Sequence, residues 1–506
     1  MIRLSSRIRP LLSLTAIGLA LTFGGWQAHA DEPAVVTAPV ASLDSVLAPL
    51  TEDRLFRDSS VSLQVVDVAT GQEVYAYNAD TALNPASTMK VVTAAAALRE
   101  LGPSYRFTTT LLRDGDVNNE GVLEGDLYVR GTGDPTMVLE KLWKMVYDLK
   151  LEGVTEVSGD VVFDRSFMDS EYAIPGWDKK EDIERGPSYF PSLGALSLNF
   201  NTVAVVVGPG PKVGEPARAQ LETAAPGIIE IENELRTGSK GTRRVINLER
   251  EVEGSKMTLK VSGSIPQETS AQRYYRSVPD PTAYFTAAFA DMMKQHGIKV
   301  RGHYVDGETP SDARQLVELR SPPLAMILMD TNKYSNNFMA EQVLKAVGAE
   351  AKGAPGTTAK GLEVVSEYLT ELGIPEGEAT LINGSGLSRE LYLRPTHLTA
   401  VLVDMAHDPK VGHEFSSSLA IGGRDGTLWA RFRDEDEVDR LRGKTGTLNG
   451  VHCLAGYVEA ADGREYAFAF LVNDLPYSIS RARRVHDRFA DIMFGLDAQA
   501  LAESSP

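Results

Sequence analysis

Ser87-Thr88-Met89-Lys90 is the stretch from which the rest of this sequence can be organised. It follows Asn84-Pro85, an N-cap residue and a proline suited to the first position of a helix, and it precedes the helical run Val91 to Leu101. We therefore expect Ser87 in the first turn of a buried helix, where free N–H groups and the helix dipole favour an anionic oxygen. The i, i+3 spacing places Lys90 on the same face, and a lysine in a dry site can act as a base. The alternative for this motif alone is a capping serine beside a solvated lysine.

Two further short motifs follow, Ser335-Asn336-Asn337 and Lys444-Thr445-Gly446. A Ser-x-x-Lys or a Ser-x-Asn occurs by chance about once or twice in a chain of this length, so the order and context of the motifs carry the argument. The last motif leads into the alternating stretch Val451 to Val458 and, after a hairpin signal, into the apolar run Tyr466 to Val472. This pattern predicts an antiparallel meander whose first strand can donate backbone N–H groups to a carbonyl lying beside it. A surface lysine followed by a turn glycine is the alternative for this motif alone.

Together the motifs read Ser-x-x-Lys, Ser-x-Asn and Lys-Thr-Gly, a combination typical of serine acyl-transfer enzymes that attack an amide. The sequence lacks the motifs of metal-dependent, nucleotide-binding and α/β-hydrolase enzymes. The eight histidines are scattered, without His-Glu-x-x-His or paired cysteines, so we expect no metal site. No dinucleotide loop, Walker lysine or Gly-x-Ser-x-Gly is present, so we expect no cofactor. His452, on the strand after the third motif, is interpreted as structural.

With these motifs and the segments around them, the chain resembles the low-molecular-mass class C penicillin-binding proteins, and within them the penicillin-binding protein type 4 family. Further stretches that resemble the family are Gly131 to Thr136, Leu196 to Asn201, Asn383 to Arg389 and Gly426 to Leu428. The resemblance implies an α/β multidomain protein: a penicillin-binding/β-lactamase-like transpeptidase domain, an antiparallel sheet with flanking helices, that carries inserted β-rich domains. It also implies a serine-type D-alanyl-D-alanine carboxypeptidase and endopeptidase that acts on peptidoglycan stem peptides and cross-linked muropeptides and is covalently inhibited by β-lactams.

The resemblance implies a role for each motif residue. The catalytic residues are Ser87 as nucleophile, Lys90 as base, Ser335 as proton relay, Asn337 as the residue that orients Lys90 and the substrate amide, and Lys444. The charge of Lys444 is expected to help keep Lys90 neutral. Lys444 with Thr445, Gly446 and Thr447 receives the terminal carboxylate of the substrate.

Three more residues are implied contacts for a diamino-acid side chain: Arg389, Asn449 and Asp164. Arg389 can form a bidentate pair with a carboxylate, and Asp164 can accept from an ammonium group. Each of the three is equally explained as a surface ion-pair residue.

Two rival functions stay open. A class A β-lactamase needs a glutamate for deacylation, and Glu232-Asn233-Glu234-Leu235 superficially resembles that loop, although it precedes Ser335 and is followed by Arg236. A non-enzymatic scaffold or sensor would hold a ligand at the serine without releasing D-alanine. Turnover separates the three possibilities, and protein partners are not predicted.

The spacing of the motifs predicts an insertion, because residues 91–334 separate Lys90 from Ser335. Short β-type runs punctuated by Gly, Pro and Asp fill this stretch. By resemblance, residues 31–104 and 321–506 form the catalytic domain, 105–133 and 227–320 form one inserted domain, and 134–226 form another. Val485 to Leu496 is expected to be the closing helix.

The N-terminus reads as a cleaved signal peptide over residues 1–30. Arg3, Arg7 and Arg9 precede the apolar run Leu11 to Phe23, and Ala28-His29-Ala30 has the small-x-small pattern of a cleavage site. We expect a periplasmic protein without a transmembrane anchor. The single cysteine, Cys453, allows no intrachain disulfide. The net charge of −18, more negative still once those arginines are removed, argues against a nucleic-acid partner.

Overall fold

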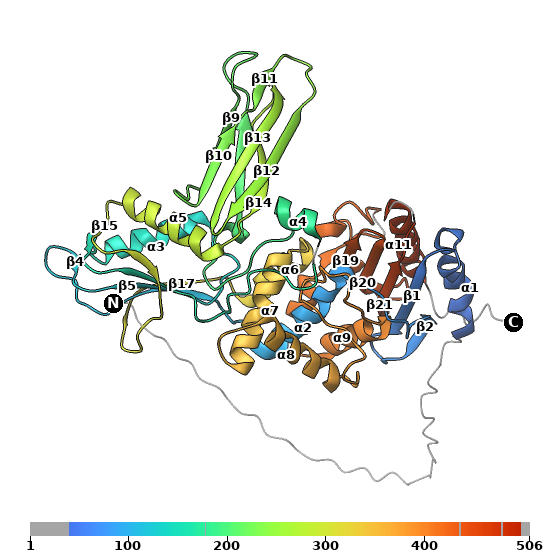
Figure 1. The fold of residues 1–506 in the computed structure, drawn as a ribbon. Helices are drawn as coiled ribbons and strands as arrows, with labels where there is room; N and C mark the ends of the chain where they lie inside the picture. The colour runs from blue at the N-terminus through green and yellow to red at the C-terminus, as the bar shows by residue number, and fades with distance from the viewer. Residues whose placement is uncertain (1–39, 178, 435–436, 477–478, 497–506) are drawn as a thin grey trace, which may run out of the picture. The chain divides into compact units, whose positions relative to one another are not determined.

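The computed structural model describes residues 40–177, 179–434, 437–476 and 479–496, and the predicted signal peptide lies outside them. One antiparallel sheet of six strands, in the order β18-β19-β20-β21-β1-β2, joins early and late parts of the chain (Figure 1). The predicted meander is confirmed, because β19, β20 and β21 pair in sequence order. The strands are β1 (Ser60–Asp67), β2 (Glu73–Tyr77), β18 (Ala420–Ile421), β19 (Leu441–Leu448), β20 (Val451–Glu459) and β21 (Glu465–Asn473).

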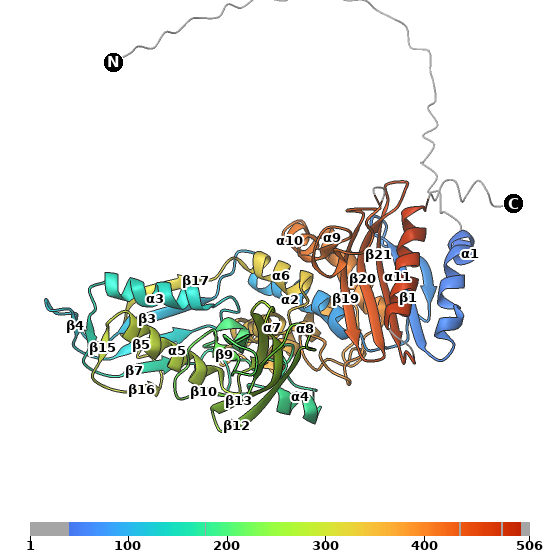
Figure 2. The ribbon, with the colours of Figure 1, turned by 90° about the horizontal axis from the view of Figure 1, so that it is seen from above.

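Helices cover both faces of this sheet, since β20 and β21 are buried along nearly their whole length. Alternate side chains face opposite ways, so Val458 and Phe468 pack with α1 and α11, whereas Tyr457 and Ala467 pack with α2 and α9 (Figure 2). This arrangement confirms the predicted α/β class. The helices are α1 (Val40–Thr51), α2 (Met89–Leu101), α6 (Leu324–Lys333), α7 (Asn337–Lys352), α8 (Thr358–Glu371), α9 (Pro395–His407), α10 (Gly412–Ser418) and α11 (Ile479–Phe494).

Helix α11 is the predicted closing helix, but it begins at Ile479 rather than at Val485. Its apolar positions recur at helical spacing from Ala482 onward, so the first turns also pack on the sheet. Within the described ranges, no helix combines the length and apolar character needed to cross a bilayer.

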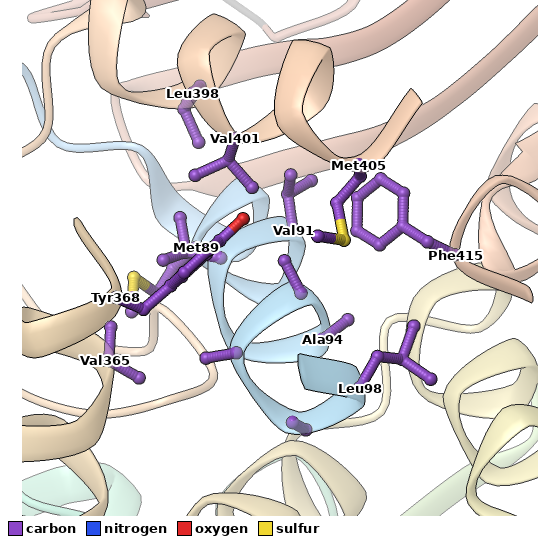
Figure 3. Packing of buried hydrophobic residues seen from close by; sticks show 14 of the residues in the cluster. Met89, Val91, Ala94, Leu98, Val365, Tyr368, Leu398, Val401, Met405 and Phe415 are labelled. Atoms are coloured by element: carbon purple, nitrogen blue, oxygen red, sulfur yellow. The ribbon is translucent and has the colours of Figure 1, made fainter. Parts of the chain in front are cut away.

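Helix α2 is the centre of the catalytic-domain core and is buried from Met89 to Leu98. Figure 3 shows it surrounded by side chains of three other helices, among them Tyr368 of α8, Val401 of α9 and Phe415 of α10. The small residues of its alanine run let these helices approach closely. The start of α2 is therefore held by packing on every side.

Ser87 does not lie in the first turn of α2, as we expected, but in the 3-10 turn η2 (Ala86–Thr88) directly before it. The side chain of Asn84 accepts a hydrogen bond from Ala86 N at 2.9 Å, and Thr88 N donates to Pro85 O at 3.1 Å. Ala86 has a φ of 46°, which interrupts the regular helix. The tight turn leaves the Ser87 side chain half-buried instead of packed within the helix.

The first layer of the insertion is a five-stranded sheet, β16-β7-β5-β3-β17, with α3 and α5 packed against it. A small parallel sheet, β15-β6-β4, lies at its end (Figure 1). These elements are β3 (Thr108–Arg113), β4 (Val122–Leu123), β5 (Leu127–Gly131), α3 (Leu139–Leu151), β6 (Glu156–Val157), β7 (Val161–Asp164), α5 (Pro281–Gln295), β15 (Lys299–Val300), β16 (Tyr304–Asp306) and β17 (Arg314–Arg320).

The remaining strands form two further sheets, β14-β8-β9 and β10-β13-β11 with β12 paired to β13. They are β8 (Thr202–Gly208), β9 (Arg218–Leu221), β10 (Ile229–Asn233), β11 (Arg236–Gly238), β12 (Val245–Glu253), β13 (Lys256–Pro266) and β14 (Gln272–Ser277). The short helix α4 (Lys180–Arg185) precedes them.

The strand pairing divides the insertion differently from the boundaries predicted at residues 134 and 226. Strand β7 pairs with β5 across the first boundary, and β9 lies in the same sheet as β14 across the second. The predicted boundaries thus separate strands that lie in one sheet, because short β runs in a sequence do not reveal their partners. We propose instead that the inner unit extends from β8 to β14, inside an outer unit built on the five-stranded sheet.

Candidate active site

The three motifs, far apart in the sequence, meet at the start of α2. Lys90 Nζ lies 3.2 Å from Ser87 Oγ, and it donates to Asn337 Oδ1 at 2.7 Å and to the carbonyl of Ser385 at 2.6 Å. Lys90 is fully buried, so its ammonium group has exchanged water for these three oxygens. The amine is therefore positioned beside the serine oxygen by two other contacts.

Burial lowers the pKa of Lys90 to about 7, and the carboxylate of Glu341 acts in the opposite direction. Burial is the largest cause of the lowered pKa of Lys90, and the charge of Lys444 is not among its causes. This corrects our expectation that the charge of Lys444 helps to keep Lys90 neutral. The pKa of Lys444 is itself well below its usual value, through burial and then through the charge of Lys90. The charge of Lys90 therefore disfavours the charge of Lys444, and burial makes neutral Lys90 accessible near pH 7.

Ser335 and Lys444 form the second half of the site. Lys444 Nζ donates to Ser335 Oγ at 2.8 Å and to the carbonyl of Thr445 at 2.7 Å. Ser335 lies between α6 and α7 with a φ of 56°, an uncommon conformation for a serine. The next residue, Asn336, caps α7 by accepting from Met339 N at 3.1 Å. This turn places the serine and the first residue of α7 beside each other.

Asn337 connects the lysine to the insertion. Its Oδ1 accepts from Lys90, whereas its Nδ2 donates to the carbonyl of Tyr189 at 2.8 Å. Tyr189 follows α4 and its side chain is 46% exposed. The inserted region thus supplies one wall of the site through the segment after α4.

Strand β19 passes directly beside the turn that carries Ser87. A Cβ added to Gly446 would lie 2.5 Å from the carbonyl oxygen of Pro85, so only glycine permits this approach. Thr445 Oγ1 donates to Thr427 Oγ1 at 2.9 Å, and Thr447 Oγ1 lies 3.2 Å from Nδ1 of the buried His452. The side chain of Thr447 therefore has a defined position at the site.

Among residues 383–389 we predicted a role only for Arg389, and we did not predict that Glu341 belongs to the site. Gly386 has a φ of 79°, and a Cβ there would lie 1.9 Å from the carbonyl oxygen of Ala86. The fully buried carboxylate of Glu341 accepts from Gly384 N at 3.1 Å and from Ser385 N at 2.7 Å. Glu341 lies one helical turn after Asn337. A carboxylate within an otherwise buried helix was the feature of the sequence that could have indicated its place in the site.

Ser87 opens into a cavity of about 530 Å³, which we call the Ser87 pocket. Its lining includes Asn337 and Thr447 from the motifs, the predicted side-chain contacts Arg389 and Asn449, and also Trp177, Lys179, Asp182, Tyr189, Leu387 and Leu448. Arg389 Nη1 donates to the carbonyl of Asn449 at 2.7 Å. The structure therefore brings together all but one of the predicted groups.

Asp164 is the exception. It lies at the end of β7 in the five-stranded sheet, where its buried carboxylate accepts from Ser166 N at 3.0 Å and from Thr309 N at 2.9 Å. The guanidinium of Arg130 is 3.8 Å away. These contacts close a turn between strands, so the structure contradicts the predicted substrate contact. Among the described residues that line the Ser87 pocket, the carboxylate is that of Asp182.

Glu232, the glutamate of the β-lactamase alternative, is also not among the residues that line the Ser87 pocket. Glu232 lies on β10 of the inner unit, where Lys260 is its partner at 3.8 Å. Among the described residues, no group of three or more His, Cys, Asp or Glu side chains could hold a metal ion.

The structure has an antiparallel sheet with helices on both faces. A serine, two lysines, a second serine and an asparagine lie together at the edge of this sheet. These features define an enzyme of the penicillin-binding class. The D-Ala-D-Ala carboxypeptidase 3 (S13) family model matches residues 41–493. The chain belongs to this family of serine peptidases.

Individual relatives agree. The chain is 32% identical to the D-alanyl-D-alanine carboxypeptidase of an Actinomadura species over 480 residues, which cover 92% of this chain and 85% of that protein. It is similar to the crystal structure of penicillin binding protein 4 (dacB) from Haemophilus influenzae, with a TM-score of 0.75 and 25% identity over 90% of this chain and all of that one. A structure of the same protein complexed with a novel beta-lactam matches with a TM-score of 0.71 and 25% identity, over 89% and 99% of the two chains.

Proposed function

We propose that this chain is a D-alanyl-D-alanine carboxypeptidase and endopeptidase that forms an acyl-enzyme on Ser87. Family membership and the carboxypeptidase relative support the reaction class. The observation that carries the assignment of the nucleophile is the contact between Lys90 Nζ and Ser87 Oγ, made by a fully buried lysine. It pairs a weak nucleophile with a base that can be neutral near pH 7.

The first step is attack on the carbonyl carbon of a D-alanyl peptide bond. Neutral Lys90 takes the Ser87 proton as the oxygen–carbon bond forms, and Asn337 and the Ser385 carbonyl stabilise the ammonium that results. We propose that the backbone N–H groups of Ser87 and Thr447 hold the oxyanion, and the close packing of β19 against η2 supports this role.

Loss of the leaving amine requires a proton. We propose that Ser335 delivers it, since its hydroxyl accepts a hydrogen bond from Lys444 at 2.8 Å and can be reprotonated there. Thr445, Thr447 and Lys444 are proposed to hold the terminal carboxylate, and that anion also favours the charged form of Lys444. Water then attacks the ester, and Lys90 acts as base a second time.

A side chain of the substrate fits the far end of the Ser87 pocket. Arg389 supplies a guanidinium for a carboxylate there, and Asp182 supplies a carboxylate for an ammonium group in the place that we first assigned to Asp164. Such a pair suits a diamino acid that carries both charges. Asn449 contributes its backbone by holding Arg389 in place.

The finer cellular assignments rest on the sequence pattern. We propose export across the inner membrane with the signal peptide removed, action on peptidoglycan in the periplasm, and covalent inhibition by β-lactams. The structure of a relative complexed with a beta-lactam supports the last point.

The test is to incubate the purified protein with a diacyl-D-Ala-D-Ala peptide and with a cross-linked dimeric muropeptide. We expect release of D-alanine from the first and of monomers from the second, and a penicillin adduct that maps to the tryptic peptide of Ser87. Absence of D-alanine release together with a stable penicillin adduct would favour the scaffold alternative, and rapid penicillin hydrolysis would favour the β-lactamase alternative.

A further inference from the structure

A second cavity, of about 470 Å³, shares a wall with the Ser87 pocket. Asp182 and Tyr189 line the Ser87 pocket, whereas their neighbours Ile183, Glu184 and Phe190 line this one. The floor is contributed by the inner unit, with Arg250 of β12 and Ser277 of β14. We call it the Arg250 pocket.

The Arg250 side chain is held where α4, β12 and β14 meet. Its Nη1 donates to the carbonyl of Ile183 at 2.9 Å. Its Cδ would lie only 2.7 Å from a Cβ added to Gly186, the residue after α4. Gly186 in turn accepts from Ser277 N at 2.8 Å. The guanidinium is therefore in a defined position before any ligand binds.

Two further arginines flank this contact, Arg185 before Gly186 and Arg276 before Ser277. Arg276 donates to the carbonyls of Tyr275 and Leu248, while its Nε is buried without a hydrogen-bond partner. Burial and then the charge of Arg276 lower the pKa of Arg250, and burial and then the charge of Arg185 lower that of Arg276. The positive charges of Arg276 and Arg185 therefore each disfavour the charged form of a neighbouring arginine.

No carboxylate neutralises this group within the described part of the chain. The bonds of Arg250 and Arg276 go to backbone carbonyls and, weakly, to a methionine sulfur. Glu184, which also lines the pocket, is exposed and has Lys180 as its partner at 3.7 Å. A chain with 69 acidic and 51 basic residues has ample acids to pair three arginines, so their isolation here points to an external anion.

We propose that the Arg250 pocket binds a free carboxylate of the second, uncut stem peptide in a cross-linked substrate. This inference rests on the proposed function and extends it to the larger substrate. A guanidinium fork is suited to a carboxylate, and the apolar lining from Phe190 and Val252 suits a short peptide beside it.

Helix α4 separates the two pockets by its width, because its adjacent residues Asp182 and Ile183 line different pockets. A helix with its side chains is about 10–12 Å across, and an extended peptide spans that width in about three to four residues. We therefore expect a cross-linked substrate whose D-alanyl bond lies at Ser87 to continue past α4, whereas a short carboxypeptidase substrate ends in the Ser87 pocket.

The experiment compares three substrates with full-length enzyme: a diacyl-D-Ala-D-Ala peptide, a cross-linked dimer with free carboxylates, and the same dimer amidated only at the remaining carboxylates of the uncut stem peptide, with the carboxylates assigned to Lys444 and Arg389 left free. We expect the wild-type enzyme to cleave the free-carboxylate dimer with a KM about tenfold below that of the amidated dimer, in line with one charge-assisted hydrogen-bonding partner. Arg250→Gln removes this preference while kcat/KM for the small peptide and the penicillin acylation rate stay unchanged. Glutamine keeps a polar N–H near the position of the Arg250 Nε but carries no charge.

Arg273→Gln is the matched control, because Arg273 lies on the same strand as Arg276 but is exposed and paired with Glu222 at 2.8 Å. Arg250→Lys, which retains the charge, is expected to keep part of the preference. The inference is overturned if Arg250→Gln retains the wild-type preference, or if it slows all substrates and penicillin equally while folded by circular dichroism. Failure of the wild-type enzyme to cleave any D-alanyl bond would instead overturn the proposed function.

Discussion

The region around Ser87 and the inner unit from β8 to β14 differ in the burial of their charged side chains. In the first, Lys90, Lys444 and Glu341 are fully buried and are held by hydrogen bonds to fixed partners. In the second, Glu249 and Glu251 of β12 are exposed, and Lys260 of β13 pairs with Glu251 at 2.7 Å. Burial shifts a pKa and immobilises a group, whereas exposed pairs contribute little free energy.

This difference assigns separate tasks to the two regions. The buried lysines supply chemistry, because only a desolvated lysine can serve as a base near neutral pH. The inner unit offers surfaces that can select a substrate without altering the reacting atoms. Substitutions in the first region should therefore affect every substrate, and substitutions in the second should affect some or none.

The largest effect is expected for Ser87→Ala. Removal of the attacking oxygen should lower D-alanine release by at least roughly a thousandfold, as for other catalytic nucleophiles. Labelling by a fluorescent penicillin should disappear, while the melting temperature stays close to that of the wild type because the side chain is only half-buried. A penicillin adduct on another residue of the variant would show that Ser87 is not the nucleophile.

Lys90→Arg tests whether this side chain is a base or only a cation. Arginine cannot lose its proton in a protein, so we expect acylation to fall by a factor comparable to that for Ser87→Ala. Stopped-flow acylation by a labelled penicillin measures it. Acylation at a rate near that of the wild type would assign the base to another group.

Gly386→Ala tests the close contact between residues 384–386 and the turn at Ser87. The new Cβ would overlap the Ala86 carbonyl oxygen, and a displacement of about 1 Å at the nucleophile costs about a hundredfold in kcat. Gly373→Ala is the control, since Gly373 has a similar φ of 84° but open space around it. If both variants lose activity equally, backbone strain and not the contact explains the loss.

The pH dependence of acylation sharpens the argument about burial. Lys90 must be neutral to act, and its pKa is about 7, so the rate should rise with pH through that value and fall about tenfold per unit well below it. Glu341→Gln removes the carboxylate whose charge raises the pKa of Lys90, so the midpoint should move to lower pH. A flat profile between pH 5 and 8 would contradict a role for Lys90 as base.

The smallest effect is expected for Glu232→Gln in the inner unit. Its exposed pair with Lys260 contributes at most about 1 kcal/mol, so stability should hardly change. Acyl-enzyme lifetime with penicillin should equal that of the wild type, measured by loss of the adduct in intact-protein mass spectrometry. A longer lifetime would revive the β-lactamase alternative.

Sequence alone determined the local parts of this protein. The apolar run after Lys90 predicted α2, and the alternation after Lys444 predicted the meander, because both depend on periodicity within a few residues. The order of the three motifs predicted the reaction class. The resemblance of these motifs to a known family implied that Ser87, Lys90, Ser335, Asn337 and Lys444 act together, which their distances now support.

Only the tertiary structure decided which distant residues became neighbours. Asp164 and Asp182 are both acids in the insertion, yet one closes a strand turn and the other lines the Ser87 pocket. Glu341 became part of the site because α7 packs against residues 384–385, and burial rather than a neighbouring charge set the pKa of Lys90. Strand partners and desolvation depend on contacts across the whole chain, and a one-dimensional pattern does not contain them.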